Sequence, residues 1–363
     1  MNRTAVLYAL GSAALFGLAP PAAKLLLGSI NPAVLAGLFY CGAGIGVALL
    51  RRLRMAGLTA SDTHEAALTR RDIPWLAGAV ICGGIAGPLL LMIGLTQTTA
   101  ATASLLLTFE AAATALIAWF IFHEHLNARV ALGMAALVGG AMILAWSETP
   151  TFDGLLGPLA IVGACIAWGL DNNLTRKVSL SDPLQIVEIK GLGAGPCNLA
   201  LAFWAGGSLP AAAPIAIALA VGFVGYGLSL VLFVLALRDL GSARTGAYFS
   251  TAPFVGSLLA VVLLAEPMTL GLIAAGGLMA LGTWLHITEH HTHLHIHEPM
   301  AHSHSHTHDE HHRHAHTGDE PPGEPHSHFH LHDRLEHAHP HTPDMHHTHR
   351  HDKARTENAI DKR

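Results

Sequence analysis

The chain has 363 residues, of which 51% are hydrophobic and 12% are charged, and its formal net charge at pH 7 is −5. This composition, with a mean hydropathy of +0.43, excludes an ordinary soluble enzyme for most of the chain. Long apolar runs fill residues 4–286, whereas residues 287–363 contain almost none. The first part is therefore predicted to lie in a membrane and the second part outside it.

Ten segments are apolar enough to cross a bilayer as helices, which takes about 20 residues each. Strands are a poor alternative, because the runs are too long and a lipid-spanning barrel alternates apolar and polar residues. The ten predicted spans cover residues 4–27, 33–50, 73–93, 100–122, 129–147, 154–174, 184–205, 214–236, 243–264 and 269–286. We expect an all-α polytopic membrane protein in contact with the lipid bilayer.

Basic residues lie in every second connection between these spans. Because Lys and Arg concentrate in cytoplasmic loops, they predict the orientation of the chain. The basic connections contain Arg3, Arg51, Arg52, Arg54, Arg70, Arg71, Arg129, Arg176, Lys177, Arg238 and Arg244, and the other connections contain no Lys or Arg. Both termini are therefore predicted to be cytoplasmic, with the chain integral to the inner membrane of the cell.

One stretch of the chain occurs twice. Residues 95–126 align without a gap with residues 237–268. Both copies run from a polar turn through small residues and an apolar span to a glutamate, Glu124 or Glu266. Internal repeats decide architecture, so this pair indicates a protein built of two related halves.

The two halves also begin in the same way. Residues 12–24 match residues 164–176, so each half opens with a glycine-containing helix that ends in a cation. Because five spans is an odd number, the halves must cross the membrane in opposite senses, which permits alternating access to a site between them. The predicted domains are a first five-helix repeat over 1–147, a second over 148–286 and a disordered His-rich cytoplasmic tail over 287–363.

Several of these features resemble one family of carriers. The two five-helix halves, a first helix with Gly17 and Lys24, and spans that end in HEHL (123–126) and AEPM (265–268) are similar to the EamA branch of the drug/metabolite transporter superfamily. The resemblance covers residues 4–286. It implies a ten-helix secondary carrier of a small solute, often an exporter of amino acids, metabolites or drugs.

Glu110, near the middle of the fourth predicted span, is the leading candidate for a substrate-binding or coupling residue. An ionisable group within a span is costly and usually faces a cavity or a partner. Its role would be to bind a substrate ammonium or to carry a proton, because burial favours the neutral form of an acid. The alternative is a structural ion pair or a buried polar contact. The family that the chain resembles often has Glu-Pro here, whereas this chain has Glu110-Ala111, and its second half has Ala252-Pro253.

Other candidates lie nearer to the ends of the spans. Lys24 follows two prolines, which free backbone polar groups, and it either pairs with a substrate carboxylate or extends toward the membrane interface. The remaining substrate-binding or coupling candidates are Asp171, Glu188 and Lys190, and the gating or structural candidates are Glu124, Glu266, Pro20, Pro21 and Pro253. For Asp171, Glu188 and Lys190, pairing within the protein or interfacial exposure is the alternative to substrate contact.

Of the 28 histidines, 25 lie between His286 and His351, mostly as His-x-His with small or polar residues between them. Such a composition is not expected to form a packed core. Neutral imidazole binds Zn²⁺, Ni²⁺, Co²⁺ and Cu²⁺, and this binding should weaken below about pH 6.5. The predicted metal ligands are His293, His295, His297, His302, His304, His306, His308, His326, His328, His330, His332, His337, His339 and His341. The alternative is a solvated, pH-responsive tail that meets metal ions incidentally.

Together these features predict a secondary active transporter that exports a small organic solute or metabolite and carries a metal-binding cytoplasmic tail. Two alternatives stay open: a divalent-metal exporter for Ni, Co or Zn whose tail collects the cargo, and a membrane-anchored metal-storage protein. The sequence contains no nucleophile–base set, phosphate-binding glycine loop or nucleotide motif. We therefore expect no enzymatic activity, no required cofactor and no nucleic-acid partner, and we leave open whether the chain forms a homodimer.

Overall fold

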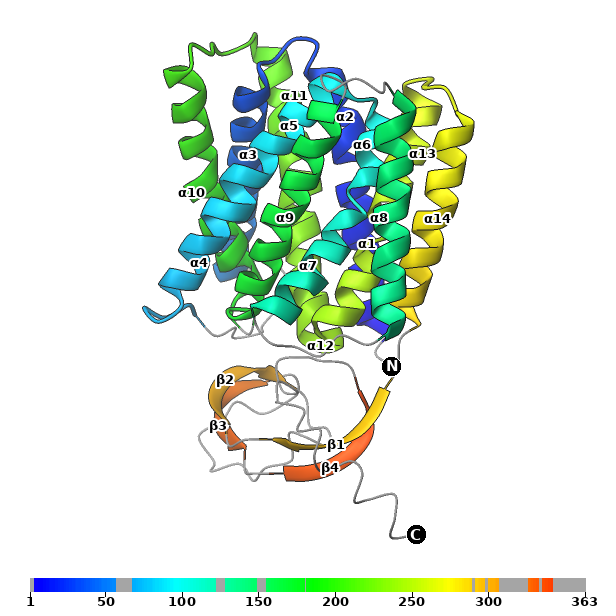
Figure 1. Ribbon diagram of the computed structural model, residues 1–363. Helices are drawn as coiled ribbons and strands as arrows, with labels where there is room; N and C mark the ends of the chain where they lie inside the picture. Colours follow the sequence, from blue (N-terminus) through cyan, green and yellow to red (C-terminus); the bar gives the residue numbers. More distant parts are fainter. Residues whose placement is uncertain are drawn as a thin grey trace.

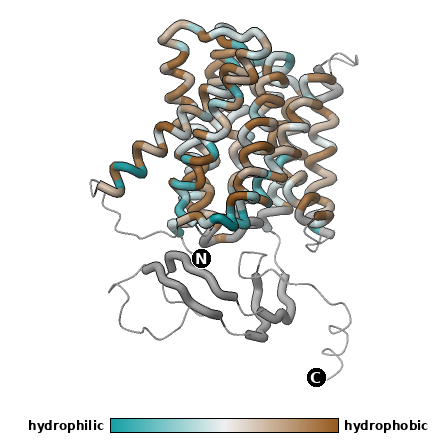
Figure 2. The backbone as a smooth tube through the Cα atoms, turned by 90° about the vertical axis from the view of Figure 1, so that its left-hand side faces the viewer, coloured by the Kyte–Doolittle hydropathy of each residue, from teal (hydrophilic) through white to brown (hydrophobic). Residues whose placement is uncertain are grey.

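The computed structural model is a bundle of helices with four short strands beyond one of its ends (Figure 1). The structure describes residues 3–56, 67–121, 128–148, 155–179, 181–288, 291–297, 300–306, 326–332 and 335–341. The N-terminus lies at the end of the bundle that faces the strands (Figure 1). Hydrophobic residues dominate along the helices, and hydrophilic residues gather mostly toward this same end (Figure 2).

The helices of the first half are α1 (Arg3–Gly17), α2 (Ala19–Leu26), α3 (Pro32–Met55), α4 (Ile73–Ala79), α5 (Gly87–Gln97), α6 (Ala100–Leu106), α7 (Phe109–Phe120) and α8 (Ala128–Glu148). Those of the second half are α9 (Leu156–Arg176), α10 (Pro183–Trp204), α11 (Ala212–Gly222), α12 (Ser229–Phe249), α13 (Ala252–Leu263) and α14 (Leu270–Ile287). Two π-helical turns, η1 (Val80–Ala86) and η3 (Phe223–Leu228), join α4 to α5 and α11 to α12.

Six helical segments in the described part of the chain are long and apolar enough to cross a membrane. They are Arg3–Leu26, Pro32–Met55, Ile73–Gln97, Ala100–Ile117, Pro183–Trp204 and Ala212–Leu237. Three shorter apolar helices cover Ala131–Leu144, Ala252–Leu263 and Leu270–Leu285. The remaining predicted span, 154–174, coincides with α9. The helical part of the chain is thus an all-α membrane protein, as its composition predicted.

The second span of each half begins with the same local signal. Asn31 precedes Pro32 at the start of α3, and Asp182 precedes Pro183 at the start of α10. Each Asn or Asp side chain accepts a hydrogen bond of 3.0 Å from the backbone N–H two residues further on. Proline suits the first turn of a helix, because its missing N–H has no helical partner there.

The helices α3 and α10 lie against each other through small residues. A Cβ added to Gly44 would lie 2.6 Å from the backbone N of Leu192, and one added to Gly195 would lie 2.7 Å from the backbone N of Cys41. Gly195 stands 151 residues after Gly44, and Leu192 stands 151 residues after Cys41. Each helix therefore makes the same close contact with the other, which small residues permit within a membrane.

The first helix of each half packs mainly on the other half. The helix α1 contacts α12 and α13, and α9 contacts α5 and α7. A Cβ added to Gly17 would lie 2.7 Å from the backbone O of Ala252, and one added to Gly169 would lie 2.9 Å from the backbone N of Thr114. The two halves are therefore interlocked by corresponding contacts.

One boundary between predicted spans is absent. The helix α12 runs through Ser229–Phe249 and joins residues that were predicted in the separate spans 214–236 and 243–264. In the first half, Thr98 and Thr99 are extended, and the Thr99 side chain caps α6 by accepting from the N–H of Thr102. The corresponding residues of the second half are Leu240 and Gly241, which offer no hydroxyl for a cap.

The tail contains four strands, β1 (His291–His297), β2 (Met300–His306), β3 (His326–His332) and β4 (Leu335–His341). They form two antiparallel pairs, β1 with β4 and β2 with β3. The backbone register places His293 opposite His339 and His304 opposite His328. These strands lie within 287–363, the segment for which disorder is predicted, and their His-x-His pattern has the period of two that strands require. Of the predicted metal ligands, His308 lies outside the described residues.

Candidate functional site

A cavity lies between the two halves of the helical bundle. The first half contributes residues from α1, α3 and α7, and the second half contributes residues from α9, α10, η3 and α12. The lining residues are Phe16, Tyr40, Ala43, Glu110, Trp168, Asp171, Asn172, Val187, Lys190, Gly191, Gly225, Tyr226, Ser229, Leu230, Phe233 and Phe249. The space among them is about 580 Å³, a figure that includes the part open to solvent.

Glu110 reaches the cavity from a helix that is broken within its span. The helix α6 ends at Leu106 and α7 begins at Phe109, with a turn between them. The N–H of Glu110 donates to the carbonyl O of Leu107 at 3.0 Å, three residues back instead of four. Glu110 therefore lies in the first turn of α7, where the helix dipole favours negative charge.

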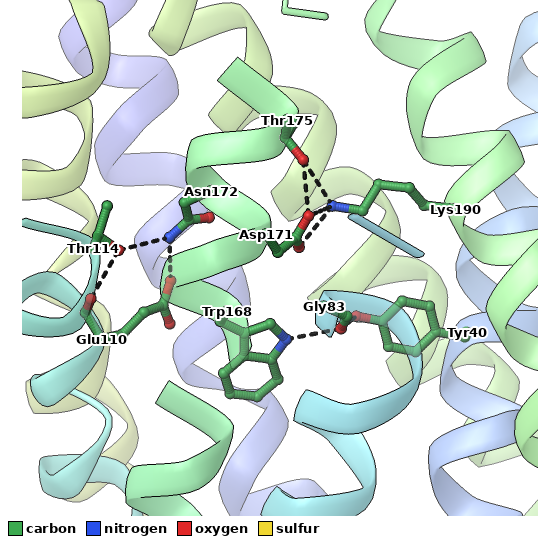
Figure 3. A network of polar contacts seen from close by, with 9 residues as sticks. All are labelled: Tyr40, Gly83, Glu110, Thr114, Trp168, Asp171, Asn172, Thr175 and Lys190. Carbon is green, nitrogen blue, oxygen red and sulfur yellow. Dashed lines mark hydrogen bonds and ion pairs between the residues drawn. The ribbon is translucent and has the colours of Figure 1, made fainter. Parts of the chain in front are cut away.

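A single amide holds the Glu110 side chain. The Nδ2 of Asn172 on α9 donates to Oε1 of Glu110 at 2.8 Å and approaches Oγ1 of Thr114 at 3.3 Å (Figure 3). In the part of the chain that the structure describes, no Lys, Arg or His forms an ion pair with this carboxylate. The carboxyl group of Glu110 is therefore held by a neutral donor, with no cation partner among the described residues.

The second carboxylate of the cavity belongs to a buried ion pair. The Nζ of Lys190 on α10 lies 2.6 Å from Oδ1 and 2.7 Å from Oδ2 of Asp171 on α9 (Figure 3). Thr175 donates to Asp171 at 2.8 Å and accepts from Lys190 at 3.2 Å. Lys190 is 2% exposed and Asp171 is 6% exposed. A pair this deeply buried requires both partners, because removing one leaves an uncompensated charge.

The π-helical turn η1 supplies backbone acceptors beside this pair. The carbonyl O of Gly83 accepts from the hydroxyl of Tyr40 at 2.5 Å and from Nε1 of Trp168 at 2.9 Å (Figure 3). The next carbonyl, that of Gly84, accepts from Nδ2 of Asn198 at 2.8 Å. A π-helical turn disturbs the regular helical bonding and is frequent at functional sites. Here it fixes the two aromatic rings by their polar ends.

Aromatic side chains from both halves form one connected wall of the cavity. Phe16 lies 5.9 Å from Trp168, 5.6 Å from Tyr226 and 5.2 Å from Phe249, measured between ring centroids. The rings of Tyr40 and Tyr226 are 5.4 Å apart, and those of Phe233 and Phe249 are 4.9 Å apart. Rings at these distances interact favourably with one another and present a large apolar surface.

Two predicted candidates lie away from this cavity, at the connection between α5 and α6. The Nζ of Lys24 donates to the carbonyls of Leu95 at 2.6 Å and Thr98 at 2.5 Å. The carboxylate of Glu266 accepts from the backbone N–H groups of Ala100 at 2.8 Å and Ala101 at 2.7 Å. Both side chains therefore hold the same short segment of backbone: Lys24 binds its carbonyl groups, and Glu266 binds its N–H groups.

Glu188 belongs to a different network, between α3 and α10. Nη1 of Arg51 lies 2.9 Å from Oε2 of Glu188, and Nε of Arg51 lies 3.5 Å from Oδ2 of Asp182. Arg54 also pairs with Asp182. The structure thus assigns Glu188 and Lys190, two residues apart on one helix, to different partners, since such neighbours do not face each other.

The remaining candidates are helix-terminal residues. Pro20 and Pro21 lie buried in the first turn of α2, and Pro253 lies buried in the first turn of α13. Proline is tolerated there, and each of these positions follows a break in a span. Glu124 lies outside the described residues.

Sequence reasoning did not identify the aromatic wall or the two π-helical turns. Phe16 and Trp168 are equivalent positions of the matched segments 12–24 and 164–176, so the repeat contained a signal for this contact. The turns η1 and η3 also correspond, at the shift that relates residues 95–126 to 237–268. No residue pattern along a single span marks either feature.

Comparison with known proteins gives a family match over both halves. The EamA-like transporter family matches residues 3–146 and 155–288. An uncharacterized transporter of Methanothermobacter thermautotrophicus (strain Delta H) is 28% identical over 285 residues, which cover 74% of this chain and 82% of that protein. A solved crystal structure superposes with a TM-score of 0.58, covering 77% of this chain and 94% of the other. Its sequence identity is 16%, so it shows the fold alone.

Proposed function

Because the chain belongs to the EamA-like transporter family, we propose that it is a secondary active carrier that exports a small organic solute through the cavity around Glu110. Membership of this family makes the chain a membrane transporter, and it confirms the prediction that the chain is not an enzyme. The position of Glu110 carries the proposal: a carboxylate without a cation partner among the described residues lies at a helix break and lines a cavity that both halves form.

The proposed architecture has ten spans in two inverted five-helix repeats, with both termini in the cytoplasm. The corresponding contacts of Gly44 with α10 and Gly195 with α3, and of Gly17 and Gly169 with the opposite halves, support this arrangement. In an inverted repeat, rocking one half against the other exposes a central site first to one side and then to the other. A solute bound at Glu110 would then cross without a continuous pore.

The connection between α5 and α6 is the proposed outer closure. Lys24 and Glu266 hold its backbone at both ends, and every residue of α6 is buried. Opening this end requires the loss of these four charge-assisted hydrogen bonds, which are stronger than bonds between neutral groups. The energy for transport would come from a solute or ion gradient.

The tail is proposed to bind transition-metal ions as a buffer or sensor. Its composition supports this role, because imidazole is a common ligand of Zn²⁺, Ni²⁺, Co²⁺ and Cu²⁺. The backbone register adds that histidines of paired strands stand opposite one another. Metal export and metal storage are the competing functions, and the flux experiment described next tests them against the export of an organic solute.

The test is flux into inverted membrane vesicles, using radiolabelled aromatic amines, amino acids, a sugar and ⁶³Ni²⁺. We expect the intact chain to move at least one organic solute and Glu110→Gln to abolish that flux, with Glu188→Gln as a control that also removes one carboxylate. Flux of Ni²⁺ alone, lost when residues 289–363 are deleted, would instead establish a metal exporter. No protein-dependent flux of any solute would refute the carrier function.

A further inference from the structure

The charges of the cavity point to the class of solute. Its lining contains two carboxylates, Glu110 and Asp171, and one ammonium, Lys190. Lys190 contacts both oxygens of Asp171 and the hydroxyl of Thr175, so these two charges cancel. One negative charge remains on the lining, at Glu110.

The immediate surroundings of Glu110 suit a nitrogen cation. The Asn172 amide donates to one carboxylate oxygen, Oε1, and among the described residues no side chain donates to the other oxygen, Oε2. An ammonium group supplies such donors together with the missing positive charge, and charge-assisted bonds of this kind are strong. A divalent metal ion needs several oxygen or nitrogen ligands to replace its water, and the rest of this lining is largely apolar.

The aromatic wall suits the remainder of such a molecule. The ring of Phe16 contacts the rings of Trp168 and Tyr226, and all three residues line the same cavity as Glu110. Aromatic rings bury apolar surface and also attract cations through their faces. An organic cation with an aromatic or bulky apolar body is therefore complementary to both parts of the lining.

The same lining opposes a carboxylate on the solute. Lys190 is the cation of the lining, and its ammonium group already bonds both oxygens of Asp171 and the hydroxyl of Thr175, so a solute carboxylate would have to displace one of these partners. Loss of the bonds to Asp171 would leave that carboxylate buried without its counter-charge, which is strongly unfavourable. Lys24, the other cation considered for this task, lies at the α5–α6 connection with its Nζ on the carbonyls of Leu95 and Thr98.

We infer that the solute is an organic ammonium ion with an aromatic or bulky apolar body and no carboxylate, bound by Glu110 and Asn172 against the Phe16–Trp168–Tyr226 wall. This inference rests on the proposed carrier function, of which it names the substrate class. It predicts that the protein binds aromatic amines in preference to the amino acids that have the same aromatic group, although the two classes differ only in the carboxylate.

The experiment compares three ligands of nearly equal shape: phenethylamine, phenylalanine and 3-phenylpropionate. Their binding to the full-length purified protein in lipid nanodiscs is measured by calorimetry, and their flux is measured in vesicles. Phenethylamine should bind at least about tenfold more tightly than phenylalanine, the equivalent of about 1.4 kcal/mol, and 3-phenylpropionate should not bind. Glu110→Gln should weaken the binding of phenethylamine at least about tenfold, whereas Glu188→Gln should leave it unchanged.

The outcomes separate the inference from the carrier function. Equal or tighter binding of phenylalanine, together with its flux, would overturn the ammonium class and keep the carrier. Phenethylamine binding that depends on Glu110 but is not followed by flux would support the site and refute the carrier. If Glu110→Gln folds poorly, Trp168→Phe and Asn172→Ala test the same site, and unchanged phenethylamine affinity in both would overturn the inference.

Discussion

Around the cavity, the charged residues divide into one neutral pair and one unbalanced carboxylate. Lys190 and Asp171 join α10 to α9 and are almost completely buried. Glu110, by contrast, is half-buried and is held by the amide of Asn172. The pair therefore joins two helices, whereas no cation of the described residues pairs with the single carboxylate.

The pair depends on a glycine that brings η1 close to α9. A Cβ added to Gly83 would lie 1.9 Å from Oδ2 of Asp171. Its carbonyl also accepts from Tyr40 and Trp168, so the same residue positions both the ion pair and part of the aromatic wall. A methyl group at this position would displace several groups of the site together.

We predict that Gly83→Ala destabilises the protein by about 1–3 kcal/mol, because the new methyl group has no room beside Asp171. Thermal unfolding in detergent would measure the loss, and phenethylamine binding should weaken with it. Gly193→Ala is the matched control, since its Cβ would lie 3.5 Å from Cγ1 of Val80, an ordinary contact. Equal unfolding temperatures of the two variants would contradict the argument.

Sequence reasoning identified Glu110, Asp171 and Lys190 as candidates but not their partners. Asp171 and Lys190 stand 19 residues apart on two helices, and Asn172 and Glu110 stand 62 residues apart. Hydrophobic periodicity indicates that a residue lies in a span, but it contains no distance between spans. The rotation and separation of the helices decide which side chains meet.

Among the elements, the helix breaks decide how the site is built. The turn between α6 and α7 places Glu110 at a helix start, and η1 turns carbonyls toward Tyr40, Trp168 and Asn198. In the connection between α13 and α14, Ala265 has a φ of 52°, a conformation that favours glycine. Ala265 follows α13 and directly precedes Glu266, whose carboxylate accepts hydrogen bonds from the first two backbone N–H groups of α6.

We predict that the double variant Lys24→Met, Glu266→Gln opens this end of the bundle. Leu230 lines the cavity, so a Leu230→Cys reporter, in a chain whose four native cysteines are replaced, would report access to it. The reporter should react severalfold faster with a membrane-impermeant thiol reagent added on the side opposite the termini. The cause is the loss of charge-assisted bonds to the α5–α6 connection.

The control for this prediction is Glu188→Gln, which removes a carboxylate from the α3–α10 network instead. Its labelling rate from the same side should equal that of the reporter chain alone. If the double variant also labels at that rate, Lys24 and Glu266 do not limit access to the cavity.

Across the whole molecule, the two helical halves and the tail are separate parts of the chain. The family match covers residues 3–146 and 155–288, so the histidine-rich segment follows the matched region. The helical core packs through corresponding contacts of the two halves, and the four tail strands pair with one another. Removal of the tail should therefore leave the carrier intact.

We predict that a chain ending at Thr288 keeps its thermal stability and its organic-solute flux but loses high-capacity Zn²⁺ binding. In the full chain, Zn²⁺ binding should be strong at about pH 7.5 and largely lost at about pH 5.5, because imidazole, with a pKa of about 6.5, is then protonated and cannot ligate. Equilibrium dialysis at the two pH values measures this change. Unchanged Zn²⁺ binding after truncation would place the metal site elsewhere.

The linear chain was enough to predict the membrane class, the two matched halves, the family and Glu110 as the leading candidate carboxylate. These follow from composition, from the repeat of 95–126 in 237–268 and from the cost of an ionisable group within a span, all of which are properties of the linear chain.

The tertiary structure alone decided that Lys190 cancels Asp171, that Lys24 holds a backbone connection, that α12 is continuous and that aromatic rings of both halves form one wall. Each of these depends on how helices distant in sequence are rotated and packed. Because small residues let the helices approach at many points, the pattern of a single span does not specify which faces meet.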